Sequence, residues 1–131
     1  MRNNTRHLLG LRLNVWAASA GHLVLTWLML TPASGLPEID LPLSDKGAHI
    51  IVYALIFVLW ARAFQLPAQT GRRALLLIVS LTAYGIAIEY IQETFVLNRT
   101  GDLADVLANL IGLLAGLLIY SWRQRQMESK N

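Results

Sequence analysis

The 131-residue sequence contains no cysteine. This absence excludes disulfide bonds, thiolate metal sites and cysteine nucleophiles, and it gives no indication of the redox compartment. Charge is also scarce: charged residues make up 15% of the chain, whereas soluble domains typically contain about 25%. Hydrophobic residues account for 55%. The chain is long enough for one domain, over residues 1–131, and its composition favours a protein that is solvated partly by lipid.

What the sequence has in place of charge is a set of long apolar runs. They cover approximately residues 11–31, 47–66, 73–97 and 103–122. Each is long enough for an α-helix to cross the roughly 30 Å hydrocarbon core of a bilayer, and none carries the wide charged stripe of a soluble amphipathic helix. A soluble helical bundle of this composition would have too little polar surface to cover itself. We therefore predict an all-α, four-helix transmembrane bundle.

The first apolar run also has features of a secretory signal peptide. Basic residues precede it, and Ala18-Ser19-Ala20 is similar to a cleavage site. The apolar run nevertheless continues to Leu30. We therefore expect it to be retained as the first span, with its central residue His22 hydrogen-bonded between helices.

The basic residues are unevenly distributed around the four runs. Lys46 and Arg99 lie toward one side. The other nine of the eleven lie toward the opposite side, in the N-terminal part, in the 62–73 segment and in the C-terminal tail: Arg2, Arg6, Arg12, Arg62, Arg72, Arg73, Arg123, Arg125 and Lys130. Because cytoplasmic segments are enriched in Lys and Arg, this predicts that both termini are cytoplasmic. The net charge of +3 then reflects membrane topology. No basic face with interleaved aromatics accompanies it, so we expect no nucleic-acid partner.

Polar residues recur at helical spacing near the outward ends of the last three runs. Side chains three or four residues apart share a helix face. These stripes consist of Asp45, His49 and Tyr53 at the start of the second run, Glu89, Gln92 and Glu93 near the end of the third, and Asp102, Asp105 and Asn109 at the start of the fourth. With a rise of about 1.5 Å per residue, all three reach the outer third of the membrane. Because an unpaired carboxylate in hydrocarbon is costly, we predict that they converge in an acidic pocket open to the outside.

Two glycines, Gly112 and Gly116, continue the polar stripe of the fourth run. Small residues four apart let helices approach closely. They are suited either to packing within the chain or to dimer formation, and packing within the chain is the simpler use.

The same residues resemble the pattern of the VanZ-like family. The likeness lies in DKGAHIIVYALIF, from Asp45, and EYIQETFVLNRTGDLADVLANLIGLLAG, from Glu89. The family pattern, D-K-x-x-H-x-x-x-Y, E-x-x-Q, R-x-x-D-x-x-D and N-x-x-G-x-x-x-G, falls on Asp45, Lys46, His49, Tyr53, Glu89, Gln92, Arg99, Asp102, Asp105, Asn109, Gly112 and Gly116. The resemblance implies a small four-helix protein of the bacterial cytoplasmic (inner) membrane. The founding member of the family is an accessory of glycopeptide-resistance operons that is linked to reduced susceptibility to teicoplanin. The resemblance supplies a cell-envelope setting but no reaction.

Three interpretations of the polar residues remain open. The first is acid–base catalysis on a lipid-linked envelope precursor, with Glu89, His49 and Asp105 as the catalytic candidates. The second is a binding pocket without catalysis. In either case we expect the ligand to be bound by Asp45, Lys46, Tyr53, Gln92, Arg99, Asp102 and Asn109. The third is a hydrogen-bond network that only holds the helices together.

We expect no cofactor. A divalent metal on His49 and the carboxylates is a lesser alternative, because the outward side has one histidine and no H-E-x-x-H spacing. The favoured function is recognition, with or without modification, of a membrane lipid or lipid-linked cell-envelope component, with teicoplanin tolerance as the phenotype. The alternative is a non-catalytic accessory subunit that packs against a larger membrane protein complex.

Overall fold

The structure is a computed structural model that describes residues 2–31, 45–68, 71–96 and 103–130. In these ranges the chain forms four helices and no strand: α1 (Arg2–Leu30), α2 (Asp45–Ala63), α3 (Arg72–Phe95) and α4 (Leu103–Glu128). All four are long and apolar enough to cross a membrane. The prediction of an all-α, four-helix transmembrane architecture is therefore confirmed.

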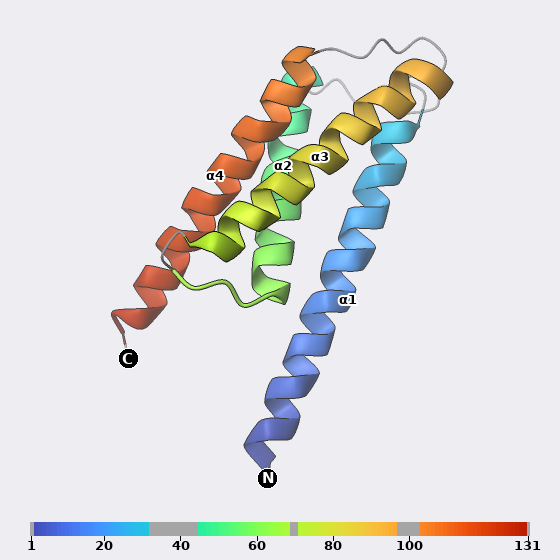
Figure 1. The fold of residues 1–131 in the computed structure, drawn as a ribbon. Helices are drawn as coiled ribbons and strands as arrows, with labels where there is room; N and C mark the ends of the chain where they lie inside the picture. The colour runs from blue at the N-terminus through green and yellow to red at the C-terminus, as the bar shows by residue number, and fades with distance from the viewer. Residues whose placement is uncertain (1, 32–44, 69–70, 97–102, 131) are drawn as a thin grey trace.

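The helices are arranged around α2. The most extensive helix–helix contact joins α2 to α4, while α1 packs mainly on α2 and α3 packs mainly on α4. The N-terminal end of α1 and the C-terminal end of α4 lie at the same end of the bundle (Figure 1), as an even number of crossings requires. Which side of the membrane this end faces stays a prediction.

The exterior of the bundle is apolar, and its fully buried centre is small. Large hydrophobic side chains are exposed on every helix, among them Trp16, Leu55, Leu76 and Leu118. Such a surface suits lipid as the surrounding solvent. The centre of the bundle is filled by side chains that include Tyr53, Ile56, Phe57 and Leu113.

Glycines set the distance between α2 and α4. A Cβ atom at Gly112 would lie 2.4 Å from the Ile50 carbonyl oxygen, and one at Gly116 would lie 2.7 Å from the Ala54 carbonyl oxygen. Real Cβ atoms essentially never approach another heavy atom so closely. Both glycines are thus used for packing within the chain, where α4 lies directly against the backbone of α2.

The helix α2 ends at Ala63 although the apolar run continues to residue 66. The Leu66 N–H donates to the Ala61 carbonyl over 3.0 Å, the Gln65 N–H donates to the Arg62 carbonyl over 3.2 Å, and Gln65 has a φ of 49°. These two bonds around a left-handed residue form a Schellman C-cap. Two other boundaries differ clearly: α1 begins at Arg2 instead of residue 11, and α4 runs on to residue 128 because the residues after 122 include strong helix formers such as Arg, Gln and Met.

Tyr120 fastens α4 to the C-cap of α2. Its buried hydroxyl donates to the Leu66 carbonyl over 2.9 Å and accepts a hydrogen bond from the Gln124 amide over 2.6 Å. We expect Tyr120→Phe to lower the free energy of unfolding by about 1–3 kcal/mol, because the buried carbonyl loses its side-chain donor. Reversible unfolding in mixed micelles measures the change. The matched control is Tyr90→Phe, which removes an exposed hydroxyl and should cost less than about 0.5 kcal/mol; equal losses in the two variants would contradict the prediction.

Candidate functional site

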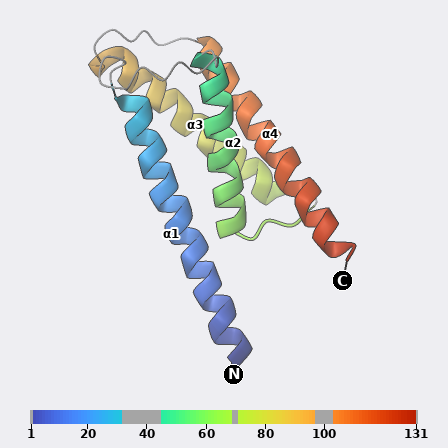
Figure 2. The same cartoon turned by 180° about the vertical axis from the view of Figure 1, so that it is seen from behind.

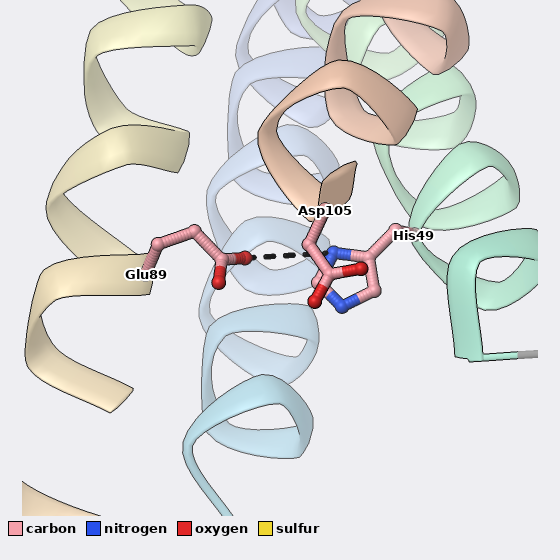
Figure 3. A group of neighbouring side chains, drawn as sticks. All are labelled: His49, Glu89 and Asp105. Carbon is pink, nitrogen blue, oxygen red and sulfur yellow. Dashed lines mark ion pairs between the residues drawn. The ribbon is translucent and has the colours of Figure 1, made fainter. Parts of the chain in front are cut away.

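Three buried ionisable side chains from three helices meet near the end of the bundle where α2 and α4 begin. They are His49 of α2, Glu89 of α3 and Asp105 of α4, exposed by 4%, 6% and 7% respectively. Their potential ligand atoms all lie within 4.8 Å of one another, and Figure 3 shows the side chains turned toward a common centre. The structure therefore brings together the three residues that the sequence nominates for acid–base chemistry, while their role stays a prediction.

Helix position explains why these residues meet. Asp105 lies in the first turn of α4, and His49 lies one turn into α2. The α3 helix runs past them so that Glu89, less than two turns before its last residue Phe95, reaches the same level. Each side chain thus comes from near a helix end, but each points into the bundle.

His49 contacts both an amide and a carboxylate. Its Nδ1 lies 2.8 Å from Asn109 Oδ1 and 3.8 Å from Glu89 Oε1. Because an amide oxygen only accepts, His49 Nδ1 carries a proton and donates it to Asn109. This bond fixes the ring so that Nε2 remains the atom that gains or loses a proton, as acid–base chemistry requires.

A second ion pair connects the site to the exterior. Lys46 Nζ lies 3.0 Å from Asp105 Oδ1, and the Lys46 side chain is 48% exposed. Lys46 is therefore the member of the site that a ligand arriving from outside the bundle meets first. With His49 protonated, the two cations balance the two carboxylates and the site has no net charge.

Unpaired hydrogen-bond donors lie one helical turn deeper. The Tyr53 hydroxyl and the Asn109 amide nitrogen are buried and have no hydrogen-bond partner among the described residues. A Cβ atom at Gly85 would lie 3.0 Å from the Tyr53 hydroxyl and 3.2 Å from the Asn109 nitrogen, so both donors abut the α3 backbone. A buried polar atom without a partner costs about 1–3 kcal/mol, and such an atom calls for a specific explanation.

The other predicted binding residues are placed differently. Gln92 turns toward α1, where its amide donates to the Met29 carbonyl over 2.6 Å, so within the described residues it acts as a tie between helices. Arg99, Asp102 and the side chain of Asp45 lie outside the described residues. Neither of the two cavities described for the bundle is lined by His49, Glu89 or Asp105. The outward-open pocket thus stays a prediction.

His49, Glu89 and Asp105 are residue types that can bind a metal ion. One imidazole and two carboxylates can bind zinc or a harder divalent cation. However, the Lys46 ammonium already pairs with Asp105, and it would repel a cation held there. The expectation of no cofactor remains a prediction.

A separate polar network ties α1 to its neighbours. The Trp60 indole donates to His22 Nδ1 over 2.9 Å, the Tyr84 ring lies edge-on to His22 with 4.4 Å between ring centroids, and the Tyr84 hydroxyl hydrogen-bonds Thr26. Thr26 in turn donates to the His22 carbonyl over 2.6 Å. The expectation for His22 is therefore confirmed. Sequence reasoning missed Tyr84 and Thr26, although Thr26 lies four residues after His22 and so on the same face.

The sequence is similar to known proteins over most of its length. A model of the VanZ/LLP1 family matches residues 11–124. The chain is also 31% identical over 93 residues to an uncharacterized protein of Schizosaccharomyces pombe, an alignment that covers 70% of this chain and 56% of the yeast protein. The chain thus spans little more than half the length of that relative. No solved structure matches it.

Proposed function

Because this multi-pass membrane chain belongs to the VanZ/LLP1 family, we propose that it recognises the polar head of a lipid or lipid-linked cell-envelope component, and that His49 and Glu89 exchange a proton with that ligand. The observation that carries the proposal is the buried meeting of His49, Glu89 and Asp105 from three helices.

The free-energy cost of burying these ionisable groups supports a role in ligand binding. Charged groups within a bilayer cost several kcal/mol unless they are paired or wet, and they commonly mark functional sites. The network of His22, Trp60 and Tyr84 shows how this bundle joins helices with uncharged groups that bond one another. The site at His49 instead retains carboxylates and, at Tyr53, a buried donor without a partner. A role in helix packing alone does not need that cost.

Each residue has a role in the proposal. Lys46, held by Asp105 and exposed at the rim, attracts the anionic part of the ligand head. Glu89 exchanges a proton with the ligand through its carboxylate, and His49, oriented by Asn109, exchanges one through Nε2. In the proposal, Asp45, Arg99 and Asp102 contribute further polar contacts to the ligand.

The proposed setting is the bacterial cytoplasmic membrane, with this end of the bundle facing outward and teicoplanin tolerance as the phenotype. The skewed distribution of Lys and Arg supports the orientation, and the resemblance to VanZ supports the phenotype.

An accessory subunit is the second candidate, and α1 favours it. Only 11% of the residues in the most apolar window of this helix are buried, and it exposes Trp16, Leu23 and Trp27. Purification from native membranes followed by mass spectrometry separates the candidates: a specific copurifying lipid supports the first, and a stoichiometric partner protein without such a lipid supports the second.

The sharpest test of the site is Glu89→Gln, which keeps the shape of the side chain and removes its charge. We expect teicoplanin tolerance conferred by the chain to be lost, with the helix content retained, because the proton acceptor is gone. Glu93→Gln makes the same change one turn away on an exposed residue and should leave tolerance unchanged. Full tolerance in the Glu89→Gln variant would falsify the proton-transfer role.

A further inference from the structure

A second candidate binding site lies at the opposite, arginine-rich end of the bundle. A cavity of about 440 Å³ opens between α1, α2 and α4, and its polar lining includes Asn14, Arg62, Gln65, Arg123 and Gln124. Figure 2 shows these three helices with α2 between the other two. The volume lies in the range of small-molecule sites, about 300–1,000 Å³.

The electrostatics of this cavity favour an anion. Two guanidinium groups, those of Arg62 and Arg123, line it together, and no Asp or Glu does. Among the described residues the ion pairs are Lys46–Asp105 and His49–Glu89, so neither arginine is neutralised by a carboxylate there. Guanidinium groups bind phosphate through paired N–H donors.

The wall of the cavity is held in place before any ligand arrives. Gln124 donates to the Tyr120 hydroxyl, which donates to the Leu66 carbonyl. Gln65 lies in the left-handed region, with a φ of 49°, at a C-cap position where Gly or Asn is usual. The chain thus has a long amide side chain at the cavity where a smaller residue would suit the backbone better.

The cavity also has an apolar side. Val58, Ile119 and Met127 complete its lining, and the neighbouring exterior of the bundle is apolar. A ligand with a phosphate and a hydrocarbon chain satisfies both halves, and basic pockets between transmembrane helices bind such head groups. We propose that this cavity binds the phosphate of an anionic glycerophospholipid, with Arg62 and Arg123 contacting the phosphate oxygens and the acyl chains lying along the apolar side.

The test compares two double variants with the same change in net charge. Arg62→Gln/Arg123→Gln removes both guanidinium groups of the cavity. Like Arg62 and Arg123, Arg72 at the start of α3 and Arg125 near the end of α4 are exposed, but they do not line the cavity, and Arg72→Gln/Arg125→Gln removes them. If arginines at this end only anchor the bundle at the head groups, the two double variants behave alike.

The measurement is native mass spectrometry of the full chain in micelles containing phosphatidylglycerol and phosphatidylcholine. We expect the wild type to retain one phosphatidylglycerol in preference to phosphatidylcholine. The cavity variant should lose affinity by about tenfold or more, whereas the control should change by less than about threefold. Equal losses in both variants, or no preference for phosphatidylglycerol in the wild type, would overturn the proposal. Circular dichroism verifies that each variant folds.

Two further experiments address a cavity variant that does not fold and a ligand that is not a lipid. If the cavity variant does not fold, Arg62→Lys/Arg123→Lys keeps the charge and removes the planar fork; weaker retention than in the wild type supports the proposal, and unchanged retention contradicts it. Inorganic phosphate is tested in place of lipid by thermal unfolding. Stabilisation of the wild type by phosphate, with no phosphatidylglycerol retained, would overturn the lipid proposal and assign the cavity to a soluble phosphate ligand.

Discussion

Replacement of Gly112 by alanine is expected to force α2 and α4 apart and to cost about 3 kcal/mol or more of stability, at or beyond the upper end of overpacking effects. The added Cβ would lie 2.4 Å from the Ile50 carbonyl oxygen, 3.1 Å from its carbon and 3.0 Å from the Tyr53 Cβ. A side chain rotates away from such a clash, but the backbone of a helix does not. Only movement of a whole helix relieves it, at the most extensive contact in the bundle.

The effect should extend to the site at His49. Ile50 follows His49 directly, and Asn109, which orients the His49 ring, lies three residues before Gly112. Separation of α2 and α4 therefore lengthens the bond between His49 and Asn109 as well. We expect Gly112→Ala to lose the proposed teicoplanin tolerance together with stability.

Gly10→Ala is the matched control for Gly112→Ala. A Cβ at Gly10 meets nothing within 4 Å, and alanine favours a helix over glycine by about 1 kcal/mol. Unfolding in mixed micelles should show Gly10→Ala equal to or more stable than the wild type. If the free energies of unfolding of Gly112→Ala and Gly10→Ala differ by less than about 1 kcal/mol, the close α2–α4 contact is wrong.

Periodicity predicts a helix face but not the neighbour that the face meets. The four helices can be predicted from the apolar runs because length and hydropathy are local properties of the sequence. Gln92 lies three residues after Glu89 and was assigned to the same site. In the folded chain it instead bonds Met29 of α1, because the polar stripe of α3 is wide enough to contact two helices.

Convergence of His49, Glu89 and Asp105 was predictable because depth in a membrane follows from the count of residues along each helix. The cavity at Arg62 and Arg123 was not predictable from the sequence. These arginines are 61 residues apart in sequence, and each by itself is typical of a head-group anchor. Only the packing of α4 against the end of α2 brings them to one cavity. Gln65, whose left-handed backbone shapes the cavity, is not a residue type, such as glycine, that would predict a left-handed position.

Removal of His49 alone should harm the bundle more than removal of His49 and Glu89 together. His49→Leu takes the imidazole away from Glu89 Oε1, 3.8 Å distant, and from Asn109 Oδ1. Loss of one partner from a buried pair typically costs about 3–5 kcal/mol, whereas apolar replacement of both partners is often neutral or stabilising. We therefore expect the double variant His49→Leu/Glu89→Leu to recover about 1–4 kcal/mol over His49→Leu in micelle unfolding.

The same two variants separate stability from function. The double variant has an apolar pair where the wild type has an acid and a base, so it should fold well and still fail to confer the teicoplanin tolerance proposed for the wild type. A stable double variant with full tolerance would show that these side chains serve only to join α2 and α3. A double variant no more stable than His49→Leu would show instead that Glu89 is held by its surroundings independently of His49, and that the two do not act as a pair. Stability and tolerance must therefore be measured on the same preparations, because the proposed site is needed for the chemistry but lowers the stability of the fold.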